Sequence, residues 1–215
     1  MMAMMRWMGL LCAVALFGPL AHAAGSAEAG AMKATTCGAC HGPNGNSTNP
    51  QWPVLAGQNA IYLQAQLQDF HDRTRIDPTG VMPTQATNLT PQDIEDLAAY
   101  FSTQVPSGLE ADPSYWQPGE KLYRAGDPSR DIPACIACHG PVGRGAPAAG
   151  FPQLRAQHAV YVLAQLMQYA SDTRYTRDSK GASNGGEYDV IMHTIASRLT
   201  PQDMRDIASY VQGMR

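Results

Sequence analysis

A short cysteine motif that occurs twice restricts the possible folds of this 215-residue chain more than any other feature does. The first copy reads CGACHGP from residue 37, and the second reads CIACHGP from residue 135. Internal similarity continues beyond the motif, which indicates a tandem duplication of one structural unit. The matching segments, first copy against second, are 55–58 with 154–157, 62–67 with 161–166, 74–75 with 173–174, and 89–93 with 199–203.

The boundary between the two copies lies in residues 105–119, which are rich in proline and glycine and show no apolar periodicity. This composition is typical of a linker. We therefore expect an N-terminal unit at 24–105, a linker at 106–117 and a C-terminal unit at 118–215. Each unit is small for a self-sufficient hydrophobic core, so a large buried cofactor would supply part of the apolar interior.

The local patterns within each unit predict helices, and no run alternates as a strand would. Thr90 and Thr200 are candidate N-caps because each precedes a proline suited to the first helical position. Apolar residues then recur at steps of three and four. The fold class predicted is all-α. The other helices expected are 28–36 and 58–70 in the first unit, and 119–125 and 157–169 in the second.

The first 23 residues have the pattern of a cleaved signal peptide. Arg6 precedes an apolar stretch at 7–20, and Ala21-His22-Ala23 has the small-x-small pattern of a cleavage site. The alternative is an uncleaved membrane anchor, but the stretch is short for one. We expect export to the periplasm. The formal net charge of −3 gives no basic footprint for nucleic acid.

The motif Cys-x-x-Cys-His is the attachment signature of c-type haem. Two thiols one helical turn apart can form thioethers to the porphyrin, and the adjacent histidine can bind the iron. We expect two covalent haems, attached at Cys37 and Cys40 and at Cys135 and Cys138. Their proximal iron ligands would be His41 and His139. The alternatives are a redox disulfide, half a zinc site, or one zinc site that pools all four thiols. Haem is favoured because histidine follows both cysteine pairs.

The distal iron ligands can be sought by elimination among the methionines. Aligning the two copies pairs Met82 with Met192, and no other methionine of the exported chain is matched by one in the other copy. We expect both to ligate iron from loops, with His193 as a neighbouring rival to Met192. Pro53 and Pro152 are candidates to accept the second N–H of the proximal histidines, the alternative being simple turn prolines.

The sequence resembles the cytochrome c4 family, dihaem carriers with two class I cytochrome c domains in tandem. The resemblance rests on the order of the two CxxCHG motifs, the segments at 55–58 and 64–67, Met82-Pro83, and 97–101. Phe151-Pro152, 157–158, 161–166 and 208–213 carry it in the second unit. It implies ligation of one iron by His41 and Met82 and of the other by His139 and Met192. It also implies electron transport from a quinol-oxidising complex to a terminal oxidase, often of the cbb3 type, with at most peripheral membrane association.

The two copies differ in one loop and in charge. The histidine-to-methionine spacing is 41 residues in the first unit and 53 in the second, because the second contains an additional stretch at 175–189. The polar composition of this stretch favours a mobile loop before Met192. The first unit carries three basic and seven acidic side chains, whereas residues 106–215 carry eleven of each. This asymmetry predicts a lower potential for the first haem, and a basic partner docking on that unit.

An iron with protein ligands on both faces has no open position for a substrate, so we expect an electron carrier with no catalytic residue. One alternative is the electron-accepting dihaem subunit of a periplasmic dehydrogenase, such as a flavocytochrome sulfide dehydrogenase. Another is an enzyme such as a dihaem peroxidase or a thiosulfate dehydrogenase, which would need one replaceable iron ligand.

Overall fold

The computed structural model describes residues 25–214, and the predicted signal peptide at 1–23 lies outside them. The described chain is helical, and its only β pairing consists of isolated bridges. The first unit contains α1 (Ala27–Lys33), α2 (Thr35–His41), α3 (Ala60–His71), α4 (Val81–Ala86) and α5 (Pro91–Thr103). The second contains α6 (Trp116–Ala125), α7 (Ile136–His139), α8 (Ala159–Ala170), α9 (Gly186–Ala196) and α10 (Pro201–Gly213). Short 3₁₀ turns lie at Pro43–Gly45, Pro128–Arg130 and Pro147–Ala149.

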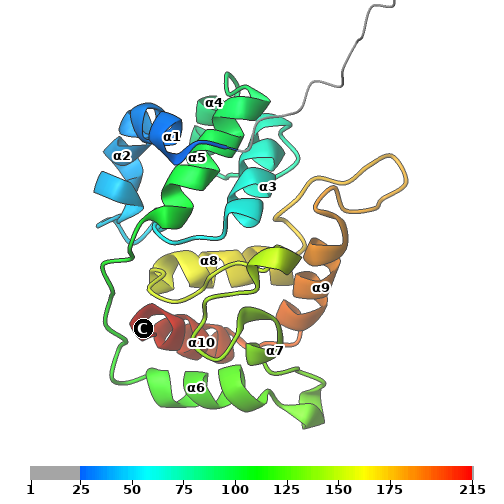
Figure 1. The fold of residues 1–215 in the computed structure, drawn as a ribbon. Helices are drawn as coiled ribbons and strands as arrows, with labels where there is room; N and C mark the ends of the chain where they lie inside the picture. Colours follow the sequence, from blue (N-terminus) through cyan, green and yellow to red (C-terminus); the bar gives the residue numbers. More distant parts are fainter. Residues whose placement is uncertain (1–24, 215) are drawn as a thin grey trace, which may run out of the picture.

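The two units lie one above the other in Figure 1, where α8 runs along their junction and the lower end of α3 approaches it from the upper unit. The segment between α5 and α6 passes down one side of the molecule and contains no helix. Each helix of the first unit has a counterpart at the same place in the second unit, from α1 and α6 to α5 and α10. The predicted all-α class and tandem organisation are confirmed.

The last helix of each unit begins as the sequence predicts. Thr90 Oγ1 accepts a hydrogen bond from the backbone N–H of Asp93, and the Asp93 carboxylate accepts one from the Thr90 N–H in return. Thr200 and Asp203 form the same reciprocal pair at the start of α10. This arrangement satisfies two N–H groups that would otherwise lack partners at the helix end.

The first and last helices of each unit cross in close contact, and glycine makes the approach possible. A Cβ atom on Gly30 of α1 would lie 2.0 Å from the Asp96 carbonyl oxygen of α5. A Cβ atom on Gly119 of α6 would lie 2.0 Å from the Asp206 carbonyl oxygen of α10. No side chain larger than hydrogen fits at either crossing, so these two positions set the interhelical distance.

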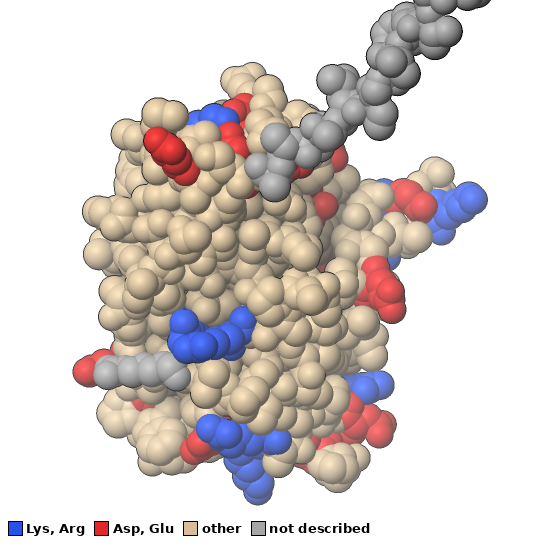
Figure 2. All heavy atoms as spheres, in the orientation of Figure 1, with Lys and Arg blue, Asp and Glu red and all other residues tan. Residues whose placement is uncertain are grey.

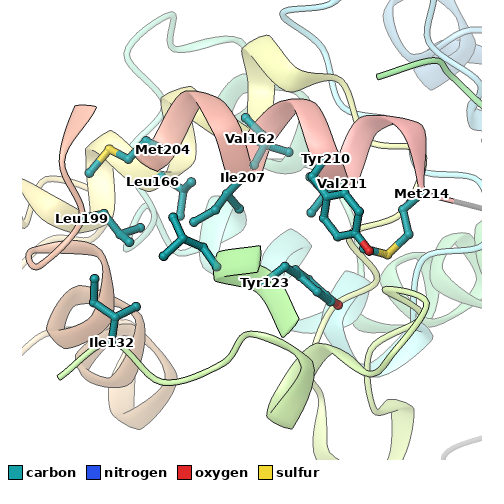
Figure 3. Packing of buried hydrophobic residues seen from close by; sticks show 12 residues of the cluster. Tyr123, Ile132, Val162, Leu166, Leu199, Met204, Ile207, Tyr210, Val211 and Met214 are labelled. Atoms are coloured by element: carbon teal, nitrogen blue, oxygen red, sulfur yellow. The ribbon is translucent and has the colours of Figure 1, made fainter. Parts of the chain in front are cut away.

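Apolar side chains form one cluster in each unit. The cluster of the second unit lies mainly along α10, with Tyr123 and Ile132 facing that helix from the other side (Figure 3). The cluster of the first unit is smaller. Its buried members are Ala34, Leu63, Leu97, Ala98 and Phe101.

Residues 175–185 form an extended loop that projects from the body of the molecule (Figure 1), whereas residues 186–189 of the predicted loop are the first turn of α9. An isolated bridge joins Arg177 and Ser183 across the loop, and Asp178 accepts hydrogen bonds from the N–H groups of Lys180 and Ala182. None of the helices between residues 25 and 214 is long and apolar enough to cross a membrane.

Candidate haem-binding sites

Both cysteine pairs lie on or beside a short helix that ends in histidine. Cys37 and Cys40 are one turn apart on α2, and Cys138 lies on α7, with Cys135 immediately before its first residue. All four are free, half-buried thiols. No group of three or more His, Cys, Asp or Glu side chains in the described chain is arranged to hold a metal ion. The described residues therefore do not bring the four thiols together, and neither cysteine pair is joined as a disulfide.

The thiols are also poor candidates for free thiolates. Burial raises the pKa of Cys37, and it raises the pKa of Cys135 to about 11. A thiolate ligand or nucleophile needs the opposite shift, because its charged form has to be populated at neutral pH. A thioether carries no charge, so these half-buried positions fit covalent attachment to a porphyrin.

The two motif histidines are buried and anchored in the same way. His41 Nδ1 lies 2.9 Å from the Pro53 carbonyl oxygen, and His139 Nδ1 lies 3.0 Å from that of Pro152. A proton on Nδ1 leaves Nε2 with the lone pair that an iron ligand needs. Burial lowers the pKa of both histidines, which favours the neutral ring. The prediction that Pro53 and Pro152 orient these rings is confirmed.

The two paired methionines lie on equivalent helices rather than on loops. Met82 is the second residue of α4, and its N–H donates to Asp77 Oδ2 at 2.9 Å. Met192 lies within α9 and packs against the apolar cluster of the second unit. Its neighbour His193 places Nδ1 2.8 Å from the Tyr169 carbonyl oxygen at the end of α8. We had expected both methionines to lie on loops. The helices were missed because glycine occupies the N-cap position of each and no side chain caps its start.

The junction of the two units contains buried polar residues for which the sequence analysis proposed no role. Gln157 Oε1 accepts from the Val54 N–H at 2.8 Å, and its Nε2 donates to the Val54 carbonyl at 3.0 Å. Gln58 makes the same pair of bonds to Gln153, at 2.7 and 2.9 Å. These glutamines occupy equivalent positions in the duplication. The recurrence of glutamine at the same position of both copies was the sequence signal that could have indicated their role.

Fold and paired motifs together define a dihaem c-type cytochrome. The cytochrome c family model matches residues 27–104 and again 117–215. Cytochrome c4 of Pseudomonas aeruginosa is 45% identical over 207 residues, covering 95% of this chain and 96% of that protein. The crystal structure of reduced recombinant cytochrome c4 from Pseudomonas stutzeri has a TM-score of 0.80 at 42% identity. The structural match covers 89% of this chain and 100% of the Pseudomonas stutzeri chain.

A more distant relative is the thiosulfate dehydrogenase electron acceptor of Thiomonas intermedia, 37% identical over 93% of this chain and 88% of that protein. The chain belongs to the cytochrome c4 family, so it is a dihaem electron-transfer cytochrome. It carries two covalently bound haem c groups, one for each cysteine motif.

Proposed function

We propose that the protein carries electrons in the periplasm, from a quinol-oxidising complex to a terminal oxidase of the cbb3 or a similar type. In this proposal Cys37 and Cys40 attach the first haem, and Cys135 and Cys138 attach the second. The axial iron ligands are His41 with Met82 and His139 with Met192. The segments at 1–23, 24–105, 106–117 and 118–215 are a cleaved signal peptide, a first domain, a linker and a second domain.

The observation that carries this proposal is a hydrogen-bonded link between the two histidine sites. Pro53 holds the ring of His41, and the next residue, Val54, is bonded to Gln157 of the other unit. Pro152 holds His139, and Gln153 after it is bonded to Gln58 of the first unit. Each proximal site is thus fixed against the opposite unit, which suits passage of electrons between two irons held at a constant separation.

Each bound haem supplies a one-electron change between ferrous and ferric iron, with no group transfer. In this proposal the buried imidazole and the methionine thioether would hold the iron and leave it without an open position. Histidine–methionine ligation raises the potential and leaves no position for oxygen or peroxide. Carriage of electrons is therefore favoured over catalysis.

The test is a spectroscopic and kinetic study of the mature protein purified from the periplasmic fraction. We expect two haems per chain, a methionine-to-iron absorption band in the ferric form, reduction by the quinol-oxidising complex and reoxidation by the oxidase. N-terminal sequencing should place the cleavage after Ala23 or one residue later. Rapid turnover of peroxide or thiosulfate by the purified protein would contradict the carrier function.

A second candidate is an electron acceptor for a periplasmic dehydrogenase, such as a flavocytochrome sulfide dehydrogenase. The relatives named thiosulfate dehydrogenase electron acceptor support this class of donor. Comparing the rates at which the quinol-oxidising complex and a dehydrogenase reduce the same protein distinguishes the two. A stable complex with the dehydrogenase, together with slow reduction by the quinol-oxidising complex, would favour the second candidate.

A further inference from the structure

The two copies differ in side-chain size at one place beside the cysteine motif. Gly38 directly follows the first cysteine of its motif, and Ile136 takes this position in the second unit. Ala34 stands four residues after the glycine at the crossing of α1 and α5, and Tyr123 stands four residues after the corresponding glycine of α6. Two large side chains of the second unit therefore correspond to a hydrogen atom and a methyl group in the first.

Tyr123 fills this place in the second unit. Its side chain is fully buried, and its ring centroid lies 5.4 Å from that of Tyr210. Figure 3 shows the ring facing α10. The Tyr123 hydroxyl donates to the Gly140 carbonyl oxygen at 2.6 Å, and Ile136 packs against the same apolar cluster. The fold accommodates a phenol ring here, with one hydrogen bond for its hydroxyl.

The first unit has a groove of about 280 Å³ at the corresponding place. A Cβ atom added to Gly38 would meet nothing within 4 Å. The Tyr100 hydroxyl donates to Asn44 Oδ1 at 2.9 Å, which holds one wall of the groove in position. Sites for drug-sized ligands occupy about 300–1,000 Å³, so this groove suits a single ring. The lining includes Ala34, Gly38, Gly42, Tyr100 and Phe101.

The groove lies outside the haem pocket proposed above. Cys37, Cys40 and His41 share one face of α2. Thr35 and Gly38, which line the groove, lie nearly opposite that face because an α-helix has about 3.6 residues per turn. The molecule that the groove accepts is therefore not the haem.

We propose that this groove binds a single phenol ring, placed as the Tyr123 ring is placed in the second unit. The ring packs between Ala34 and the aromatic side chains of Tyr100 and Phe101, which removes apolar surface from water. Its hydroxyl donates to the carbonyl oxygen of Gly42, the counterpart of the acceptor used by Tyr123.

The chemistry of the lining fits a neutral phenol. The Gly42 carbonyl oxygen accepts from the Gly45 N–H at 3.1 Å, and a carbonyl oxygen has a second lone pair for the ligand. None of the lining residues is charged, so the groove offers no cation to a phenolate. A free phenol and a tyrosine side chain of another protein present the same ring to this site. The proposal depends on neither the donor nor the acceptor of electrons.

The experiment is an NMR titration of the full-length ferrous holoprotein with p-cresol, which is the side chain of tyrosine as a free molecule. We expect the resonances of Ala34 and Phe101 to shift, with nuclear Overhauser effects between these side chains and the cresol ring. Toluene lacks the hydroxyl and should bind roughly two- to tenfold more weakly, the usual effect of one lost hydrogen bond. A parallel titration with N-acetyltyrosinamide separates the two sources. Binding of p-cresol alone indicates a free phenol, whereas binding of both indicates a tyrosine side chain.

Two variants place a large side chain in the groove. Ala34→Tyr supplies the ring that the second unit has, so it should abolish p-cresol binding and raise the melting temperature. Gly38→Ile supplies the other large side chain of the second unit and should also abolish binding. Ala65→Tyr adds the same ring at an exposed position of α3 and is the matched control, which should bind p-cresol as the wild type does.

Three results would overturn the proposal. One is a wild-type protein whose Ala34 and Phe101 resonances do not move up to the solubility limit of p-cresol. Another is binding that persists in Ala34→Tyr and Gly38→Ile. The third is toluene binding as tightly as p-cresol, which would exclude the hydrogen bond to Gly42. If neither variant takes up haem, the Overhauser contacts of the wild type decide, because contacts to residues outside the groove contradict the site.

Discussion

At the scale of single residues, the best-defined part of each haem site is the contact between the histidine ring and a proline carbonyl. The distances of 2.9 and 3.0 Å are nearly the same in the two units, although the surrounding sequences differ. The carbonyl fixes both the tautomer and the rotation of the ring. The sequence predicted these two contacts because the prolines follow the motif histidines at similar distances, 12 residues in the first unit and 13 in the second.

Replacing the proposed distal ligands should open the corresponding irons. Met82→Ala should let cyanide, imidazole or carbon monoxide bind the first haem and lower its potential, because the thioether no longer occupies the sixth position. Met32→Ala, at a side chain that is 75% exposed, is the control and should leave ligation unchanged. Absorption spectra with and without added ligand measure the effect. If Met192→Ala keeps the methionine-to-iron band of the second haem, Met192 is not its ligand.

The glutamines at the junction should act on the haem of the opposite unit. Gln157→Ala removes both hydrogen bonds to Val54, so the Pro53 carbonyl is held less firmly against His41. A weaker hydrogen bond from His41 Nδ1 to the Pro53 carbonyl makes the imidazole a less basic ligand, which stabilises ferric iron less. The potential of the first haem should therefore rise more than that of the second. The lost bonds should also reduce the free energy of unfolding by about 1–3 kcal/mol.

Redox titration followed by NMR, which separates the signals of the two haems, measures this crossed effect. Gln58→Ala should shift mainly the second haem, and the exposed Gln117→Ala should shift neither. A larger effect of Gln157→Ala on the second haem would show that Gln157 supports only its own unit.

At the scale of helices, the sequence predicted the elements that carry strong local signals. The capping boxes at Thr90 and Thr200 and the apolar periodicity of α3, α5, α8 and α10 match the observed structure. The helices α4 and α9 were not predicted, because glycine residues precede them and no capping side chain marks their starts. Packing against α3 and α8 stabilises them instead, and tertiary contacts of this kind leave little trace in the local sequence.

The crossing of α1 and α5 should tolerate no added methyl group. Gly30→Ala brings Cβ against the Asp96 carbonyl oxygen, so the helices have to separate. We expect a loss of about 1–3 kcal/mol in the free energy of unfolding, the usual cost of overpacking. Gly38→Ala on α2 is the matched control, since nothing lies within 4 Å of its added Cβ. Thermal unfolding of the holoproteins compares them, and equal melting temperatures would contradict the close crossing.

The same helix pair should lose stability in acid. Lys33 Nζ of α1 lies 2.7 Å from Asp93 Oδ1 and 2.5 Å from Asp96 Oδ2 of α5. The bonds to Lys33, with those from Thr90 to Asp93 and from Ser26 to Asp96, lower the pKa of each carboxyl to about 2. In the unfolded chain an aspartate has a pKa of about 4. The stabilisation is therefore complete above about pH 4 and is lost as the pH falls towards about 2.

Unfolding measured by denaturant titration across this acidic range tests the ion pairs. Lys33→Met should flatten the fall in stability, because both carboxyl groups then approach their usual pKa. Lys121→Met changes an exposed lysine on α6 and should leave the profile unchanged. A Lys33→Met profile parallel to that of the wild type would show that these contacts do not contribute.

At the scale of the whole molecule, the way the two units meet could not be predicted from the sequence. Its residues, such as Gln58 and Arg75, are polar, and polarity alone suggests a solvent-exposed position. They are buried because the opposite unit satisfies their hydrogen bonds. The repeated polar residues therefore marked the junction, but their partners depend on a docking geometry that no local pattern encodes.

One sequence difference between the copies should determine which of the two haems has the lower reduction potential. Asp69 is aligned with Gln168 in the second unit, and burial raises the pKa of Asp69. When ionised, this carboxylate stabilises ferric iron nearby, in the same direction as the excess of acidic residues in the first unit. The face in Figure 2 is mostly uncharged, and its scattered surface charges are screened by salt over about 8–10 Å. The Asp69 carboxylate, which is half-buried, should therefore have a larger effect than these surface charges.

The expected result is a lower potential for the first haem at mildly alkaline pH. Asp69→Asn should raise the lower potential, and Gln168→Glu should reduce the higher one. Redox titrations at low and high salt measure both changes. A first haem with the higher potential at both salt concentrations would show that neither Asp69 nor the net charge sets the order.

The contacts across the junction occur in equivalent pairs. Gln58 binds the backbone at 153 as Gln157 binds the backbone at 54, and Arg75 reaches Tyr161 as Arg174 reaches Tyr62. Such an isologous interface is the kind that joins identical subunits about a two-fold axis. The two halves therefore meet as the subunits of a homodimer would, and the linker raises the effective concentration of one half around the other. Once fused, the halves could diverge separately, which a symmetric dimer encoded by a single unit cannot do.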